Sequence, residues 1–383
     1  MSTDHIPFNR PFHVGTEARH IEAAVQSGWI SARGDYGRRC ESWLEQRIGC
    51  ARALVTHSCT AALEGAMLLA GVGPDDEVIM PSYTFATTAS SVALRGATPV
   101  FVDIRPDTLN LDESLVEAAV TERTRAIVPV HYAGVACEMD TIGAIARDRG
   151  LTVIEDAAQG ILATYKGRPL GSMGDFGALS FHETKNVTCG EGGALLVNDA
   201  EAARRAEIVW DKGTNRAEFE RGEVDRYTWI EVASSFGLGE VSAAFLWAQL
   251  ERAREVTELR LEIWNSYHDA FAELEREGRL RRPLVPPDCE HNAHMYFLLL
   301  PEPDLRARFI QELAERDIHA VFHYVPLHSS PAGRRVGRVG SGLENTERLS
   351  ERLVRLPLWA AMPDEAVHRV IEATRDSVNI LAR

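Results

Sequence analysis

Short apolar runs alternate along residues 50–200 with segments whose apolar residues have helical spacing. The apolar runs are continuous, which is typical of strands that are covered on both faces. Repeated strand–helix units predict a mostly parallel sheet flanked by helices, that is, an α/β fold. The expected strands cover 53–56, 77–80, 99–104, 125–131 and 151–155, and the expected helices cover 60–69, 84–94, 113–120 and 139–149.

The pattern changes after two further apolar runs at 177–181 and 193–197. A long helical segment is expected over 241–277, and a proline-rich stretch at 281–287 then breaks the chain. The expected elements of the smaller unit that follows are strands at 295–300 and 318–324, a helix at 305–316 and a closing helix that begins at Asp364.

We therefore expect two domains. Residues 1–240 would form a large α/β domain, and residues 241–383 a connecting helix followed by a small α+β domain. Residues 331–342 are rich in glycine and arginine, so we expect a mobile loop there.

The composition limits the possible partners. The 383 residues carry a formal net charge of −15, from 41 Lys and Arg against 56 Asp and Glu, and no basic block. We therefore expect neither nucleic acid nor a membrane as a partner, whereas a small anionic substrate could still bind a local Arg or Lys pocket. Residues 1–9 lack the layout of a signal peptide, and no apolar run reaches about 18 residues, so we expect a cytoplasmic protein.

Cysteine and histidine spacing argues against a metal site. The six cysteines form no C-x-x-C pair, which is typical of reduced, mostly buried thiols. His131, His182, His323 and His328 lack the spacing of metal ligands, so they are candidates for polar contacts with substrate or for ordinary structural hydrogen bonds. A G-x-G-x-x-G motif and a Walker P-loop are both missing, so a nicotinamide or ATP site has little support.

Asp156 and Lys185 each follow an apolar run and are 29 residues apart. An acid and a lysine at strand ends are what a pyridoxal phosphate (PLP) enzyme needs, because the lysine forms a Schiff base with the aldehyde and the acid keeps the pyridine nitrogen protonated. Asp156 could instead cap the next helix, and a lysine after a strand is usually a solvated surface residue. The glycine-rich stretch at 189–193 favours a bound ligand near Lys185, because glycine lets the backbone approach it closely.

Two other segments could complete such a site. Ser58 and Thr60 lie between a strand and a helix, where free N–H groups and a hydroxyl would bind a phosphate; alternatively, either residue merely caps the helix. Phe85 follows a strand and could stack on a cofactor ring or belong to the core. The four segments together, in this order, are far more specific than any one of them.

These residues resemble the sugar-nucleotide aminotransferases of PLP fold type I, the DegT/DnrJ/EryC1/StrS group, nearly from end to end. The resemblance is closest to the dTDP-4-amino-4,6-dideoxygalactose transaminase branch. It rests on Ser-Phe-His-Glu-Thr-Lys-Asn at 180–186 and on the segments 129–140, 164–168, 212–216 and 322–328. It implies an aspartate aminotransferase-like fold, with a large domain and a small C-terminal one.

The resemblance also implies roles for single residues. Lys185 would bind PLP and carry the proton between Cα of the amino acid and C4 of the sugar, while Asp156 would pair with the pyridine nitrogen. The remaining contacts with PLP would be made by Gln159 to the 3-hydroxyl, Phe85 to the ring face, and Thr60, the Ala61 amide and Ser180 to the phosphate.

One position departs from the family pattern. Many members carry an asparagine that reaches the phosphate of the neighbouring subunit, and Ser235 stands at that position here. Because serine is shorter, either its hydroxyl or a water molecule would have to make the contact. The resemblance implies a homodimer with the active site at the interface.

The implied reaction is transfer of the amino group of L-glutamate to a dTDP-4-keto-6-deoxyhexose. The products would be 2-oxoglutarate and dTDP-4-amino-4,6-dideoxy-D-galactose or its D-glucose epimer, since the motifs do not fix the configuration at C4. The alternatives are another keto-sugar nucleotide as substrate, or a PLP-binding regulator without turnover. Family members that dehydrate deoxysugars have histidine in place of Lys185, so the lysine favours transamination.

Overall fold

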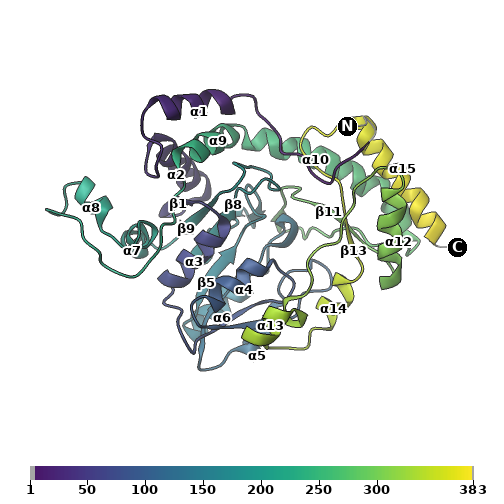
Figure 1. The fold of residues 1–383 in the computed structure, drawn as a ribbon. Helices are drawn as coiled ribbons and strands as arrows, with labels where there is room; N and C mark the ends of the chain where they lie inside the picture. The colour runs from purple at the N-terminus through teal and green to yellow at the C-terminus, as the bar shows by residue number, and fades with distance from the viewer. Residues whose placement is uncertain (1–4, 382–383) are drawn as a thin grey trace.

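The computed structural model describes residues 5–381, so residues 1–4 and 382–383, at the outer ends of the two expected domains, lie outside it. An eight-stranded sheet forms the centre of the molecule (Figure 1). Its strands, in sheet order, are β1 (Arg52–Thr56), β9 (Gly193–Val197), β8 (Phe176–Ser180), β5 (Thr152–Asp156), β4 (Thr124–Ile127), β2 (Glu77–Pro81), β3 (Thr98–Val102) and β12 (Arg338–Val339).

The sheet is mostly parallel, as predicted. Only β9 runs against its neighbours, β1 and β8, and every other pair of adjacent strands is parallel. Every residue of β2, β8 and β9 is buried, which explains the continuous apolar runs. Successive residues of a strand point to opposite faces of the sheet, and each face has its own hydrophobic core. Ile79 and Val153 lie in the first core, and Val78 and Ile154 lie in the second.

Helices cover both faces of the sheet. The first core includes residues of α2 (Asp35–Ile48), α5 (Val116–Ala119), α6 (Met139–Arg149) and α9 (Glu240–Glu251), and α1 (Glu17–Gln26) packs on α9. The second core includes residues of α3 (Cys59–Leu69), α4 (Ala86–Ala93) and α7 (Ala200–Trp210). The protein thus has the layered α/β architecture expected from the sequence.

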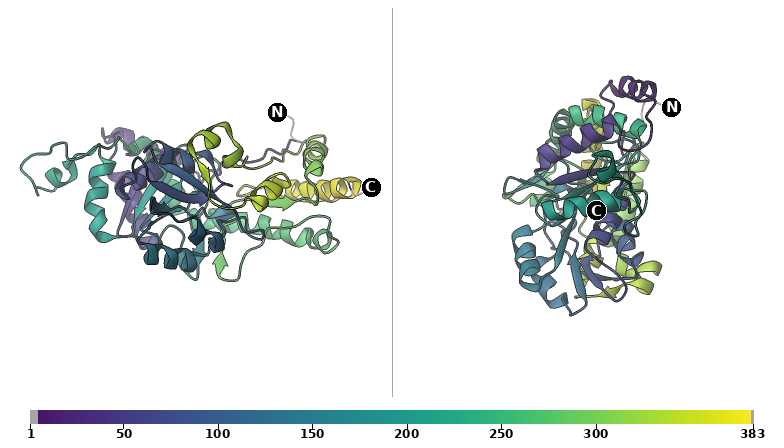
Figure 2. Two further views of the ribbon diagram at one scale, coloured as in Figure 1. Left: turned by 90° about the horizontal axis from the view of Figure 1, so that it is seen from below. Right: turned by 90° about the vertical axis from the view of Figure 1, so that its left-hand side faces the viewer.

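The C-terminal elements have a core of their own, to which Ile6 also contributes. Strands β11 (Tyr296–Leu299) and β13 (Leu353–Leu356) pair antiparallel. The helices that pack with them are α10 (Ala253–Ala270), α11 (Ala272–Arg276), α12 (Pro303–Ala314) and α15 (Asp364–Leu381). Figure 2 shows this part of the chain at one end of the molecule, beside the central sheet.

Two predicted elements of this region differ in the structure. The helical segment expected at 241–277 is divided into α9, α10 and α11, because Arg252 and Phe271 leave helical geometry, with φ near −116° and −97°. The strand expected at 318–324 is wrong: only Ile318 and Val321 make isolated bridges, the first to Ile6 and the second to Arg355.

Residues 331–342 do not form the loop that their composition suggested. They contain α13 (Pro331–Val336) and β12, which pairs in parallel with β3 in the large sheet. Ser330 caps α13 by accepting a hydrogen bond from the Gly333 amide, and Arg338 forms an ion pair with the fully buried Glu77. The chain therefore returns from the C-terminal unit to the large sheet. A single domain boundary at residue 240 does not account for this return.

The chain between α7 and α9, which contains α8 (Arg216–Glu220), forms an arm that projects from the body of the molecule (Figures 1 and 2). A second small sheet joins β6 (Thr164–Tyr165), β7 (Arg168–Pro169) and β10 (Cys289–Glu290). Within residues 5–381, no helix combines the length and the apolar character needed to cross a membrane. The six cysteines, all within this range, are unpaired, and all but Cys59 are buried.

Candidate active site

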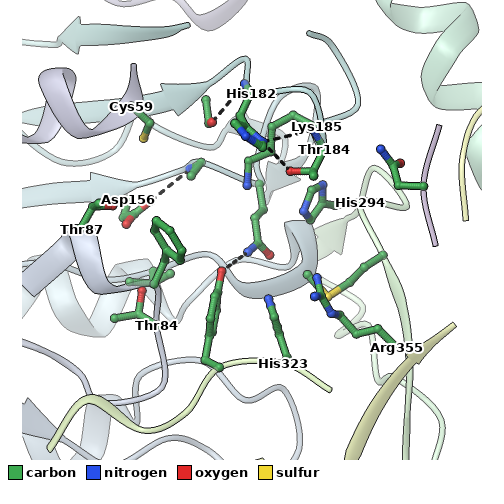
Figure 3. A pocket seen from close by; sticks show the side chains of 18 of the residues that line it. Cys59, Thr84, Thr87, Asp156, His182, Thr184, Lys185, His294, His323 and Arg355 are labelled. Atoms are coloured by element: carbon green, nitrogen blue, oxygen red, sulfur yellow. Dashed lines mark hydrogen bonds between the residues drawn. The ribbon is translucent and has the colours of Figure 1, made fainter. Parts of the chain in front are cut away.

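A cavity of about 850 Å³ lies past the carboxyl ends of β5 and β8 and is also lined by residues of the C-terminal unit. Ligand sites of open α/β sheets lie at this edge. Figure 3 shows Asp156 and Lys185 reaching this cavity from different segments. The residues predicted from the sequence that line it are Thr60, Phe85, Asp156, Gln159, Ser180 and Lys185.

Asp156 is the last residue of β5, and its side chain is held by two donors. The Thr88 hydroxyl donates to Oδ2 at 2.8 Å, and the Ala158 amide donates to Oδ1 at 3.2 Å. Burial raises the pKa of Asp156 above its usual value, although these hydrogen bonds and the nearby Lys185 act in the opposite direction. A cation opposite this carboxylate would offset the cost of its burial.

Lys185 follows β8 by five residues, and its amide donates to the His182 carbonyl at 2.9 Å. Burial lowers the pKa of its amine, against the attraction of Cys59 and Asp156. The neutral amine, which is the nucleophile and the base, is thereby favoured. The next residue fixes the segment: the Asn186 side chain donates to the Asn292 carbonyl at 2.7 Å and pairs with His294 at 3.1 Å.

The start of α3 also contributes to the wall of the cavity. Ser58 and Thr60 line it, and the first amides of a helix have no partner within the helix, so they can bind an anion. The Ser58 hydroxyl accepts a hydrogen bond from the Ala61 amide at 3.1 Å, so this amide is already used as a cap donor. Gly193 permits the close approach of β9, because a Cβ there would lie 2.5 Å from the Cys59 nitrogen.

Gln159 and Phe85 meet Tyr324 across the cavity. The Gln159 amide group donates to the Tyr324 hydroxyl at 3.0 Å, and its Oε1 accepts from the Ala133 amide at 2.6 Å. The Phe85 ring is 57% exposed, and its centroid lies 6.2 Å from that of Tyr324. Phe85 is therefore not a core residue, and its face is free to stack on a planar ligand.

A sequence profile of the DegT/DnrJ/EryC1/StrS aminotransferase family matches residues 13–375. The chain belongs to this family. It is therefore an aminotransferase of the PLP fold type I, which agrees with its mostly parallel sheet and with the position of its cavity.

Relatives match over almost their whole length. The spore coat polysaccharide biosynthesis protein SpsC of Bacillus subtilis (strain 168) is 37% identical over 381 residues, which cover 97% of each chain. The aminotransferase TlmJ from Streptoalloteichus hindustanus is 29% identical, with a TM-score of 0.90, and the match covers 99% of this chain and 100% of TlmJ. Spr1654 from Streptococcus pneumoniae, in its PLP form, is 28% identical, with a TM-score of 0.90, and the match covers 98% of this chain and 99% of Spr1654.

The cofactor of this family is PLP, and the residues of the cavity fit it. Asp156 is a buried carboxylate whose raised pKa indicates that a nearby cation would stabilise its charge, and a pyridinium nitrogen would supply one. The start of α3 can hold the phosphate, and Lys185 is a lysine with a lowered pKa in the same cavity. These three features match the pyridine nitrogen, the phosphate and the aldehyde of PLP.

Other sequence candidates lie elsewhere. Ser235 is exposed and does not line this cavity; its backbone bridges to Asp211, the residue that follows α7. His131 is fully buried, and its Nε2 donates to Glu155 at 2.8 Å while its Nδ1 accepts from the Cys137 amide, so its role is structural. His328 pairs with Ser82 and Glu347 outside the cavity.

His182 and His323 do line the cavity. Burial holds the pKa of His323 well below its usual value, and its Nδ1 pairs with the Tyr132 hydroxyl at 2.6 Å. The same ring stacks on Tyr324 at 3.6 Å between centroids. His323 is therefore a neutral side chain that helps to position the aromatic wall of the cavity.

Three residues near the cavity have no sequence signal of their own. Thr88 orients Asp156 from α4. His294 and Arg355 come from the C-terminal unit, more than 100 residues after Lys185 in the chain, and both line the cavity. The Thr88 hydroxyl also pairs with the Thr84 hydroxyl at 3.0 Å.

Proposed function

We propose that this aminotransferase transfers the amino group of L-glutamate to the keto carbon of a sugar nucleotide. The specific substrate proposed is dTDP-4-keto-6-deoxy-D-glucose, with 2-oxoglutarate and dTDP-4-amino-4,6-dideoxy-D-galactose or the D-glucose epimer as products. The observation that carries the proposal is the pairing in one cavity of Lys185, whose pKa is lowered, with the buried Asp156. The similarity to SpsC, a spore coat polysaccharide biosynthesis protein, supports a sugar substrate.

PLP, when bound, supplies an aldehyde that accepts the amino group and a ring that accepts electrons. Lys185 is assigned as the residue that holds the aldehyde and then acts as base and acid, moving a proton between Cα of the donor and C4 of the sugar. Burial lowers the pKa of the Lys185 amine, which favours the neutral form that can accept that proton. Asp156 keeps the ring nitrogen protonated, and Thr88 holds the Asp156 carboxylate in place.

The remaining roles are positional. We assign Gln159 to the ring hydroxyl, Phe85 to the ring face, and Thr60, the Ala61 amide and Ser180 to the phosphate. The Ala61 amide would have to exchange its Ser58 partner for the phosphate. Ser235 is exposed on the arm side of the molecule, and we propose that it reaches the phosphate of a second copy in a homodimer.

The test is the Lys185→Ala variant, with glutamate and the dTDP-keto-sugar as substrates. We expect the variant to lose turnover and the visible absorbance of the lysine-bound cofactor, while its folded content by circular dichroism stays unchanged. Continued transamination would overturn the assignment of Lys185. A wild-type protein that binds PLP but does not convert the sugar would instead support another keto-sugar substrate or a regulator without turnover.

The configuration at C4 follows from how the sugar is held, so it needs a separate measurement. The NMR coupling constants at C4 of the enzymatic product distinguish an axial amine, as in the galacto product, from an equatorial one, as in the gluco product. We expect the galacto product, on the resemblance of segments 129–140 and 322–328 to that branch.

A further inference from the structure

Three arginines gather at one end of the two-stranded sheet of the C-terminal unit, and we call them the arginine cluster. Arg281 forms a bridge with Leu299, the last residue of β11, and Arg352 directly precedes β13. Arg348 lies in the last turn of α14 (Glu344–Ser350) (Figure 1). Burial lowers the pKa of Arg281 and of Arg352, and the charges of the neighbouring arginines lower both further. The three cations are therefore close enough to repel one another.

The arginine cluster is separate from the cavity. Strands β11 and β13 pair antiparallel, so the pair Leu299 and Leu353 marks one end of the sheet, and the pair Tyr296 and Leu356 marks the other. The cavity is lined by Met295 and Leu356, at the second end, whereas the arginines lie at the first. Among the described residues that line the cavity, none belongs to the cluster, so the roles assigned at the active site do not account for it.

The charge of Arg281 is not balanced within the described part of the chain. Its guanidinium has no ion pair and no hydrogen bond there, although its Nη2 is shielded from solvent. The carboxylates that attract it already hold other arginines. Both oxygens of Asp107 accept from Arg105, and Glu275 accepts from the backbone amide and the Nε of Arg282. Arg281 thus needs an acceptor that these residues do not supply.

The other two arginines use only part of their donors. Arg352 donates from Nε to the Leu300 carbonyl at 2.5 Å, and Arg348 donates from Nη2 to the Asn345 side chain at 3.1 Å. Glu302 attracts Arg352, but neither arginine forms an ion pair with a carboxylate of residues 5–381. The chain has a net charge of −15, so carboxylates are abundant elsewhere. Three adjacent cations without one are unfavourable unless an anion binds them.

The chemistry of the arginine cluster favours a phosphate group. The planar fork of a guanidinium matches two phosphate oxygens, and three cations suit a dianion better than a single carboxylate. Arg348 is exposed, while Arg281 and Arg352 are half-buried, so the cluster is open to solvent. We propose that the arginine cluster binds the phosphate group of inorganic phosphate or of a small phosphate ester. This site is distinct from the cofactor site and does not depend on the proposed reaction.

Calorimetry on the PLP-loaded enzyme tests the site, with inorganic phosphate, glycerol 3-phosphate and acetate as separate probes. The bound cofactor fills its own phosphate site. We expect Arg281→Gln to weaken phosphate binding about tenfold or more, because a hydrogen-bonded charge is lost. Acetate should bind detectably to neither protein. Binding of glycerol 3-phosphate alone would identify an ester as the ligand, and binding of inorganic phosphate alone would identify the free ion.

Two further variants make the comparison specific. Arg279→Gln removes the same charge from the same segment, but Arg279 has a partner of its own, Glu277, at 2.9 Å. This matched control should bind phosphate within about twofold of the wild type. Arg348→Gln removes an exposed member of the cluster and should weaken binding as Arg281→Gln does. It therefore decides the question if Arg281→Gln does not fold.

Phosphate binding should also stabilise the protein, because the ligand would join α14, the start of β13 and the segment that pairs with the end of β11. At about ten times the dissociation constant, phosphate should raise the midpoint of thermal unfolding of the wild type by about 2 °C and leave that of Arg281→Gln unchanged.

The absence of phosphate binding, or equal binding by the wild type, Arg281→Gln and Arg348→Gln, would overturn the proposal. The second result would place the bound phosphate elsewhere, for instance in the cavity. An equal loss in Arg279→Gln would also overturn it, because the effect would then come from the general charge of the surface. Acetate that binds as tightly as phosphate would exclude a site selective for phosphate.

Discussion

The hydroxyl of Thr88 supports the acid on which the cofactor's electron-accepting role depends. It donates to Asp156 at 2.8 Å from a fully buried position. A hydrogen bond to the charged form of a carboxylate lowers its pKa, so Thr88→Val should raise the pKa of Asp156 further. Since the ionised form is the active one, activity is lost as pH falls through this pKa, and the acidic limb of the kcat profile should move to higher pH.

We expect Thr88→Val to reduce kcat about tenfold at neutral pH, which corresponds to about 1.4 kcal/mol, close to the lower end of the range usual for one hydrogen bond to a charged group. Thr88→Ser keeps the donor and should retain both the rate and the pH profile. A Thr88→Val enzyme whose acidic limb coincides with that of the wild type would exclude this role for Thr88, even if its stability had fallen.

Sequence reasoning found Asp156 and Lys185 because Asp156 ends β5 and Lys185 closely follows β8, two strands that are recognisable from their apolar runs. It did not find Thr88 or Arg355, because a hydroxyl within a helix and a single charge within an apolar strand have no local signature. Both become relevant only through contacts made across the fold, Thr88 with a residue 68 positions later and Arg355 with a cavity formed largely by the first 200 residues.

At the scale of elements, the edge strand β12 could not be predicted from the local pattern of apolar residues. It has two residues and no apolar run, and it is held by pairing with β3 and by the ion pair of Arg338 with Glu77. Gly340 follows it, and its amide donates to the Phe101 carbonyl at 2.7 Å. The large strands were predictable because burial on both faces selects apolar runs, whereas β12 depends on partners more than 200 residues away.

Gly340→Val should destabilise the protein. A Cβ at this position would lie 2.7 Å from a methyl group of Val100 and 3.2 Å from that of Ala119, so β12 would have to move away from β3. Overpacking of this kind costs about 1–3 kcal/mol, which urea unfolding followed by fluorescence can measure. Gly73→Val is the matched control, since a Cβ at Gly73 has no neighbour within 4 Å, and it should change the unfolding free energy by less than about 0.5 kcal/mol. Equal losses in the two variants would contradict the packing argument.

At the scale of the whole molecule, the sequence predicted a large α/β layer and a C-terminal unit because each has its own pattern. The arm could not be predicted from the sequence, because it has no hydrophobic core of its own that would produce an apolar pattern. The arm exposes large apolar side chains: Trp229 and Val232 are each 69% exposed, and Ile230 is 50% exposed. Clustered apolar exposure of this size is typical of a surface that another protein covers.

We expect this surface to be covered by a second copy of the chain, in the homodimer that would bring Ser235 to the neighbouring cofactor site. Trp229→Glu combined with Val232→Glu places charges in the interface and should yield a monomer, measured by sedimentation velocity, while the circular dichroism spectrum stays unchanged. The monomer should also bind PLP more weakly, because the contact from the partner's arm is lost. Ile380→Glu introduces a charge at a 41% exposed position on α15 and should remain a dimer. A double variant that sediments as the wild type does would show that the exposed apolar residues of the arm do not hold two copies together.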